Sequence, residues 1–283
     1  MDTELLHAVL TISCPDRVGI VHAVSGFLAE RGCNIVDSSQ FGDAGTSLFF
    51  LRVHLTSPVG LDALREDFAA VGSAYAMDWE LHDRRERGRL LIMVSQLGHC
   101  LNDLLYRHST GALHADLRGV VSNHPDFRGL VEAHGVPFHH VPVLPGRKAE
   151  AEERLLEVVA AEQVELVVLA RYMQVLSDDL CARLPDTINI HHSFLPSFKG
   201  ARPYHQAYER GVKVIGATAH YVTAELDEGP IIEQEVARVD HAATPDRLVT
   251  IGRDLECVAL ARAVSWHLDH RVLRNGVRTV VFP

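Results

Sequence analysis

The sequence predicts two α/β domains: a ferredoxin-like βαββαβ domain, followed by a doubly wound, mostly parallel sheet. The first is indicated by a complete order of strand, helix, two strands, helix and strand before residue 84. The second is indicated by β-prone runs that alternate with helical repeats from residue 90 onward, as in parallel sheets with helices on both faces. Between them, the polar, mixed-charge stretch 82–89 is typical of a solvated linker. We therefore expect domains at residues 1–84 and 85–283.

The first domain begins with a β-prone run at residues 6–13. Apolar residues at helical spacing from Ile20 to Leu28 then predict a helix that ends at Gly32 and has Asp16 as its N-cap. Alternating or helical apolar patterns predict the later elements: strands at 35–40 and 47–55 joined by a turn at 42–45, a helix at 61–71 and a strand at 74–81.

The second domain shows the alternation most clearly. Its predicted strands lie at 90–95, 116–122, 137–141, 164–170 and 187–191, and its helices at 99–107, 126–134 and 148–161. Thr244-Pro245 opens a further helix, and Asn275-Gly276 between two β-prone runs predicts a closing hairpin. Ligands of such sheets bind beyond the carboxyl ends of the strands, so residues that follow the strands are candidates for the site.

Composition excludes several classes of function. The 283 residues are 47% hydrophobic and 23% charged, which is typical of a soluble globular protein. The longest apolar runs, such as 164–170, are too short to cross a membrane, so we expect a cytoplasmic protein with no membrane partner. A net charge of −10 argues against binding to nucleic acid.

The cysteines and histidines do not predict a metal site or a disulfide framework. The five cysteines include no Cys-x-x-Cys pair, and we expect them to be reduced. The chain has 18 histidines, but the neighbours in His139-His140 and in His191-His192 should face opposite sides of a strand. On this alternation His192 should also face away from Asn189. We expect no metal and no cofactor.

The strand at 187–191 carries the first sign of chemistry. Asn189 and His191 leave it on the same face, because their positions differ by two. An amide that donates to a developing oxyanion, beside an imidazole that titrates near neutrality, suits attack on a carbonyl. By itself, however, an Asn-x-His triplet is better explained as two polar residues that cap a strand, because such triplets occur by chance.

Three sequence blocks resemble the folate-dependent formyltransferase family. The first is Asn189-Ile190-His191 followed by Ser193-Phe194-Leu195-Pro196 and Gly200, and the others span residues 216–222 and 227–232 in the same order as in that family. The resemblance implies a formyltransferase fold, the substrate 10-formyltetrahydrofolate and a catalytic trio of Asn189, His191 and Asp227. Asn189 would stabilise the oxyanion, His191 would protonate the leaving nitrogen, and Asp227 would hold the imidazole and position a water molecule.

The same resemblance implies a set of residues that bind the folate. They are Arg171, Tyr172, Met173, Val175, Leu176, His220, Val222 and Gly229. His220 is expected near the site without reacting, and Gly229 to let its loop approach the pterin. Alternatively, residues 170–176 only connect a strand to a helix, with Met173 and Leu176 in the core.

The nucleophile is predicted from two departures from the glycinamide ribonucleotide transformylases. Those relatives usually have Pro after the catalytic His and a small phosphate-binding loop after the first strand of the sheet. This chain has His192 at the first place and the bulkier, acid-containing stretch 96–103 at the second. Water is then the simplest nucleophile, and the predicted reaction is hydrolysis to tetrahydrofolate and formate. Formyl transfer to a small amine such as glycinamide ribonucleotide and a non-catalytic folate or amino-acid sensor remain as alternatives.

The first domain resembles the ACT family of amino-acid-sensing domains. The resemblance is carried by the motif Pro15-Asp16-Arg17-Val18-Gly19-Ile20 and by residues 32–35. It implies a homo-oligomer with an effector pocket between subunits, formed by Asp16, Arg17, Gly19 and Asn34. Glycine and methionine are the first effectors to test. Alternatively, the domain only assembles subunits.

Overall fold

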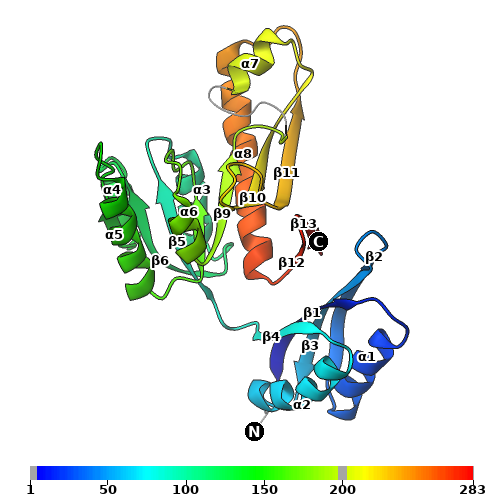
Figure 1. Cartoon of the computed structure of the whole chain (residues 1–283). Helices are drawn as coiled ribbons and strands as arrows, with labels where there is room; N and C mark the ends of the chain where they lie inside the picture. The colour runs from blue at the N-terminus through cyan, green and yellow to red at the C-terminus, as the bar shows by residue number, and fades with distance from the viewer. Residues whose placement is uncertain (1–4, 197–202, 283) are drawn as a thin grey trace. The chain divides into compact units, whose positions relative to one another are not determined.

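The structure, a computed structural model, describes residues 5–196 and 203–282. Its contacts divide the chain into two compact units (Figure 1). The first unit contains the residues up to Arg87 together with Asp269–Pro283, and the second contains Gly88–Leu268. Residues 269–283 thus group with the amino-terminal unit, whereas the sequence had placed them with the second domain.

The first unit has the predicted βαββαβ order. Its strands are β1 (Leu6–Pro15), β2 (Asn34–Asp43), β3 (Leu48–Ser57) and β4 (Asp78–Asp83), and its helices are α1 (Ile20–Glu30) and α2 (Leu61–Ala74). The four strands form an antiparallel sheet in the order β2-β3-β1-β4. Alternate residues of β1 and β3 pack with apolar residues of both helices, such as Val24 and Phe68, in one core.

Residues 269–283 join this unit through polar contacts to the sheet. The buried Arg52 of β3 donates hydrogen bonds to the carbonyl oxygens of Asp269 and His270, at 3.0 and 3.1 Å. The hairpin of β12 (Val272–Asn275) and β13 (Arg278–Val281) donates from Asn275 and Arg278 to Oδ2 of Asp43, at 2.6 and 2.7 Å. Because these partners lie far away in sequence, local patterns could not assign the hairpin to this unit.

Two local predictions in this unit were wrong. Asp16 does not cap α1, because the N-cap position is Gly19, whose φ of 99° lies in the left-handed region that glycine adopts without strain. The turn after β2 also begins later than predicted. β2 continues to Asp43, and Ser47 takes the left-handed conformation, with φ of 56°.

The second unit contains a sheet of seven strands. These are β5 (Gly88–Val94), β6 (Ala115–Ser122), β7 (Phe138–His140), β8 (Leu166–Leu169), β9 (Asp186–His191), β10 (Val214–Tyr221) and β11 (Ile231–Arg238). Their order is β11-β10-β9-β8-β5-β6-β7. The pairs from β9 to β7 are parallel, whereas β10 and β11 run antiparallel to their neighbours. The predicted mostly parallel, doubly wound sheet is confirmed.

Helices cover both faces of this sheet (Figure 1). They are α3 (His99–Ser109), α4 (Arg128–Ala133), α5 (Lys148–Ala161), α6 (Asp178–Arg183), α7 (Pro203–Glu209) and α8 (Pro245–Leu268). Helices α5 and α6 share one apolar core with β5, β6 and β8, whereas α3 and α8 pack together, and α8 lies against β9, β10 and β11. Among the residues that the structure describes, no helix is both long and apolar enough to cross a membrane.

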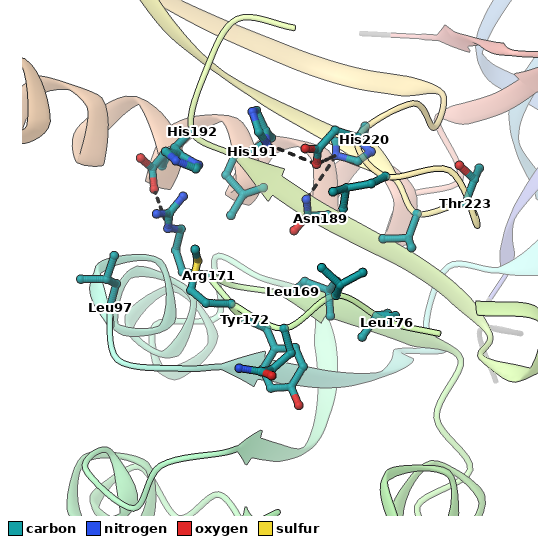
Figure 2. Close-up of a pocket in the computed structure, with 18 of the residues that line it drawn as sticks. Leu97, Leu169, Arg171, Tyr172, Leu176, Asn189, His191, His192, His220 and Thr223 are labelled. Carbon is teal, nitrogen blue, oxygen red and sulfur yellow. Dashed lines mark hydrogen bonds and ion pairs between the residues drawn. The ribbon is translucent and has the colours of Figure 1, made fainter. Parts of the chain in front are cut away.

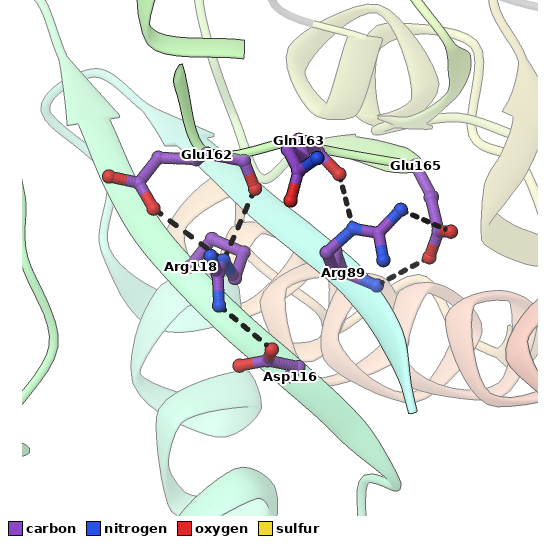
Figure 3. A network of polar contacts seen from close by, with 6 residues as sticks. All are labelled: Arg89, Asp116, Arg118, Glu162, Gln163 and Glu165. Carbon is purple, nitrogen blue, oxygen red and sulfur yellow. Dashed lines mark hydrogen bonds and ion pairs between the residues drawn. The ribbon is translucent and has the colours of Figure 1, made fainter. Parts of the chain in front are cut away.

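The two edges of the parallel strands differ in character. At the amino ends, Arg89 binds Glu165 and the carbonyl oxygen of Gln163, while Arg118 binds Asp116 and Glu162 (Figure 3). These pairs are partly exposed, so each contributes about 0–1 kcal/mol to stability. At the carboxyl ends, the chain leaves β5 and continues to β6, which pairs with one side of β5. The later strand β8 pairs with the other side of β5. Such a switch point opens a crevice where ligands bind.

Candidate active site

A cavity of about 580 Å³ lies at the carboxyl ends of β8 and β9. Its wall is built from the loop after β5, the segment after β8, the end of β9 and the segment after β10. Figure 2 shows Asn189, His191, His192 and His220 gathered on one side, with Leu169, Tyr172 and Leu176 facing them. The cavity is thus apolar on one side and rich in imidazoles on the other.

The structure brings Asn189, His191 and Asp227 together in this cavity. Asn189 and His191 come from β9, and Asp227 comes from the loop between β10 and β11. Nδ1 of His191 lies 3.2 Å from Oδ1 of Asp227. Two residues that the sequence could only assign to separate blocks therefore form a direct pair.

His220 fixes the orientation of Asn189. Nδ1 of His220 lies 2.9 Å from the carbonyl oxygen of Tyr221, which can only accept, so the proton of the neutral ring is on Nδ1. Nε2 of His220 then accepts from Nδ2 of Asn189 at 3.2 Å. Burial lowers the pKa of His220, which favours this neutral form. Because an amide nitrogen carries two protons, Asn189 keeps a second donor for a ligand.

The loop that carries Asp227 is held close to β10. Asp227 itself has a left-handed φ of 57°. A Cβ atom on Gly229 would lie 1.7 Å from the carbonyl oxygen of Tyr221, so only glycine fits there. Gly229 is therefore needed for the approach of two backbone segments. It does not belong to the cavity lining, where the sequence had expected it to approach the pterin.

His191 has one nitrogen with a partner and one without. Burial alone would raise the pKa of Asp227, but the hydrogen bond from His191 and the charge of His191 lower it below its usual range. Asp227 is therefore an anion that accepts from Nδ1 of His191. Nε2 of His191 is buried and has no hydrogen-bond partner within the described part of the chain. Because His191 lines the cavity, this nitrogen is free to bind a ligand there.

A second polar cluster, formed by His99, Arg171, Tyr204 and Glu256, closes one end of the cavity. Glu256 of α8 is 1% exposed. It accepts from His99 at 2.8 Å and from the Tyr204 hydroxyl at 2.9 Å, and Nε of Arg171 lies 3.4 Å away. Burial opposes its ionisation, but the hydrogen bond from His99 and the charge of Arg171 lower the pKa of Glu256. The group is thus a buried, internally paired ion cluster.

The sequence contained a signal for this cluster that the prediction missed. Leu248, Gly252 and Glu256 follow one another at helical spacing on the buried face of α8, so a glutamate interrupts an apolar stripe. Gly252 makes room for the ring of Tyr204, since a Cβ atom there would lie 2.0 Å from the ring. A charged residue on such a face must find partners, and here they come from three other segments.

Donor atoms of His99, Cys100 and Glu256 lie within 4.8 Å of one another, close enough for a metal ion. The carboxylate, however, already binds His99, Tyr204 and Arg171. A hydrogen bond with Cys257, followed by burial, raises the pKa of Cys100 well above its usual value and keeps the thiol protonated. His99 and Glu256 are therefore paired with each other, and Cys100 is paired with Cys257.

The other predicted folate-binding residues line the cavity. These are Arg171, Tyr172, Met173, Val175, Leu176, His220 and Val222. Met173 is 55% exposed, so it is not a core residue, whereas Leu176 packs against the core of the second unit. The segment 171–176 is held by Ser95, the residue that follows β5. The backbone N–H of Ser95 donates to the carbonyl oxygen of Arg171, and its Oγ accepts from the backbone N–H of Met173.

The prediction that His192 faces away was wrong. His192 also lines the cavity, and its ring centroid lies 5.0 Å from that of His191. β9 ends at His191, so the alternation of a regular strand does not extend to the next residue. Of the sequence block that follows, Gly200 lies outside the residues that the structure describes.

The proposed effector residues lie in the first unit at two separate places. Arg17 stacks on the ring of Tyr75 and donates to the carbonyl oxygen of Ala74. Asp16 and Gly19 lie in the connection that follows the carboxyl end of β1. Asn34 is the first residue of β2 and pairs with Thr56 of β3, which also pairs with His7 near the amino end of β1. A single chain therefore does not bring Asn34 next to the other three residues.

Comparisons with known proteins agree with this fold and site. Residues 88–264 match the family model for formyl transferase, and residues 8–73 match the model for the ACT domain. Among solved structures, glycinamide ribonucleotide transformylase 1 from Symbiobacterium toebii is 32% identical, with a TM-score of 0.65 over 70% of this chain and 95% of its own. The fold and the site thus define an enzyme with a formyl transferase domain and an ACT domain.

Other relatives match the whole chain. A formyltetrahydrofolate deformylase from Corynebacterium sp. (strain P-1) is 54% identical over 99% of both chains, and one from Bacillus subtilis is 47% identical over 96% of this chain and 93% of its own. The crystal structure of the formyltetrahydrofolate deformylase from Burkholderia mallei is 51% identical, with a TM-score of 0.94 over 98% of this chain and 100% of its own. The chain belongs to the formyltetrahydrofolate deformylase family.

Proposed function

We propose that this protein hydrolyses 10-formyltetrahydrofolate to tetrahydrofolate and formate. The observation that carries the proposal is the meeting of Asn189, His191 and Asp227 in one cavity, with Nε2 of His191 buried and unpartnered in the described structure. Full-length relatives that are 41–54% identical bear the name of this activity.

The proposed reaction follows from the roles of the three side chains. Water attacks the formyl carbon, and the second amide proton of Asn189 stabilises the oxyanion. His191 takes one proton from the water and delivers it through Nε2 to N10 of the folate as the C–N bond breaks. Asp227 holds the imidazole and stabilises its cationic form. The other proton of the water leaves with formic acid, which ionises to formate.

The folate would lie along the apolar side of the cavity. The segments 171–176 and 222–227 supply this wall, including Tyr172, Val175 and Val222. The predicted place for the pterin, near 171–176 and 222–229, overlaps this wall, and ligand pockets combine apolar walls with a few placed polar groups. The formyl group would then face Asn189 and His191.

The alternative reaction, formyl transfer to a small amine such as glycinamide ribonucleotide, would use the same trio. It is less supported because the loop after β5 places His99 against Glu256 instead of leaving room for a phosphate. The similarity to the deformylase from Corynebacterium sp. also covers 99% of this chain, whereas the similarity to the transformylase structure covers 70%.

The proposal extends to partners and location. The match to the ACT domain supports binding of an amino-acid effector, for which we propose glycine or methionine in a homo-oligomer. The separation of Asn34 from Asp16 within one chain supports a pocket completed by a second copy. We further propose a metal-free, cofactor-free cytoplasmic enzyme, without nucleic-acid or membrane partners.

The test is an assay of pure protein with 10-formyltetrahydrofolate and no added amine. Formate and tetrahydrofolate should appear in equal amounts, with and without a chelator. Loss of activity with chelator and recovery with zinc would overturn the metal-free mechanism. Product only in the presence of an amine would favour formyl transfer instead.

A further inference from the structure

His192 occupies a place in the cavity that the trio does not explain. Its ring lies beside that of His191, with centroids 5.0 Å apart and planes inclined by 42° (Figure 2). The centroid of the Tyr204 ring lies 6.2 Å from that of His192, in an edge-to-face arrangement. The side chain is partly buried and lines the cavity together with Nε2 of its neighbour. In the described part of the chain, no residue forms a hydrogen bond with the His192 ring.

The surroundings of His192 favour a neutral ring that accepts hydrogen bonds. Burial, the charge of Arg171 and then that of His191 lower the pKa of His192 to about 3, although Glu256 and Asp227 act in the opposite direction. One nitrogen of a neutral imidazole is always an acceptor. In the cluster that lines the cavity with this ring, Glu256 accepts from His99 and lies 3.4 Å from Nε of Arg171.

Both rings line the cavity, and their centroids lie 5.0 Å apart, so the nitrogens on facing edges can share one water molecule. A water joins two nitrogens through hydrogen bonds of about 2.8 Å on each side. Such a water would touch Nε2 of His191 on one side and His192 on the other. We propose that His192 holds the hydrolytic water against the formyl carbon, and thereby makes water rather than an amine the nucleophile.

This inference rests on the proposed hydrolysis and assigns one step of it. His192 accepts a hydrogen bond from the water through the proton that stays with the product, while His191 removes the other proton. The new C–O bond forms as the lone pair of the water oxygen is directed at the formyl carbon. His192 is therefore a positioning residue and takes no proton itself.

The experiment compares His192→Asn with His192→Leu. The two side chains are similar in size, but only asparagine can accept a hydrogen bond. His192→Leu should release formate about 10²-fold more slowly than the wild type, as expected when a reacting group loses its position, with little change in KM for the folate. His192→Asn should recover a large part of this loss.

A second readout tests the choice of nucleophile. With added hydroxylamine, a formyl group can pass either to water, giving formate, or to hydroxylamine, giving formohydroxamate. The ratio of formohydroxamate to formate should rise in His192→Leu and stay near the wild-type ratio in His192→Asn. His114→Ala, which replaces an exposed histidine of the same unit outside the cavity, is the matched control.

The outcomes separate this inference from the proposed function. If the wild type releases no formate without an amine, the proposed function fails. If the wild type is active and His192→Leu has equal turnover and an equal product ratio, only the role of His192 is overturned. Equal losses in His192→Leu and His192→Asn, with an unchanged ratio, would likewise overturn it and indicate a packing role.

Discussion

His191 shows how one side chain obtains its chemistry from its neighbours. Asp227 binds Nδ1, so that Nε2 is left to face the cavity. Asn189 is oriented in turn by His220, whose own tautomer is set by a backbone carbonyl. The amide of Asn189 and the imidazole of His191 are thus oriented by neighbouring side chains, as the proposed electrostatic and acid–base catalysis requires.

The first prediction concerns the trio. Asn189→Ala, His191→Ala and Asp227→Asn should each lower formate turnover by about 10²-fold or more, because each removes an oxyanion donor, the proton carrier or its anionic partner. The double variant of His191 and Asp227 should be hardly slower than His191→Ala, since the two act as a unit. Steady-state formate release measures this. Nearly full turnover in His191→Ala would exclude the mechanism.

The second prediction concerns pH and His192. Its pKa of about 3 in the folded state lies below the usual value of about 6.5, so between these values the unfolded chain binds a proton that the folded chain does not. Stability is therefore lost as pH falls through this window. Removing the group in His192→Asn should flatten the dependence of the unfolding free energy on pH by up to about 1.4 kcal/mol per pH unit.

Urea unfolding between about pH 7 and about pH 5 measures this slope. His114→Asn, at an exposed position, should keep the slope of the wild type. An identical slope in the wild type and in His192→Asn would show that His192 titrates alike in the folded and unfolded states.

At the scale of elements, the site depends on one close approach between a loop and a strand. Gly229 lies against the backbone of Tyr221, the last residue of β10, and this contact places the preceding Asp227 beside His191. The position of Asp227 thus depends on the absence of a side chain at Gly229.

The third prediction follows from this contact. Gly229→Ala should lower the free energy of unfolding by about 3 kcal/mol or more, because its Cβ would meet backbone that cannot move aside, and formate turnover should fall with it. Gly129→Ala is the matched control: nothing lies near its Cβ, and its place in α4 should make the change neutral or stabilising by about 0.5 kcal/mol. Urea unfolding of both variants decides, and equal stabilities would refute the argument.

At the scale of the whole molecule, the two proposed sites lie in different units. The described residues that line the cavity belong to Gly88–Leu268, whereas the proposed effector residues belong to the first unit. The closing hairpin is part of the first unit, because Asp43 and Arg52 bind residues 269–278. A deletion that respects only the sequence-based boundary would leave this hairpin without its partners.

The fourth prediction compares two truncations. The fragment 88–268 should hydrolyse 10-formyltetrahydrofolate without any response to glycine or methionine, since it contains the whole cavity lining. The fragment 85–283 should be less soluble, because residues 269–283 then lack the sheet that binds them. Formate release, amino-acid titration and size-exclusion chromatography measure these properties. A fragment 88–268 that is well folded but inactive would show that the first unit completes the active site.

The sequence by itself determined the elements and the chemistry of this protein. Apolar periodicity located most strands and helices, because a strand or helix face that packs on a core must repeat with the period of its backbone. The spacing of Asn189 and His191 placed both on one face of β9, and the ordered motifs added Asp227. These are properties that neighbouring residues encode.

Only the tertiary structure decided which distant residues meet. It paired His191 with Asp227, brought His220 to Asn189, assembled the cluster around Glu256 from four segments and assigned the hairpin to the first unit. It also placed His192 in the cavity, because β9 ends one residue before it. Such contacts depend on the register of strands and on the path of loops, and the hydrogen bonds that fix them join residues that no local pattern relates.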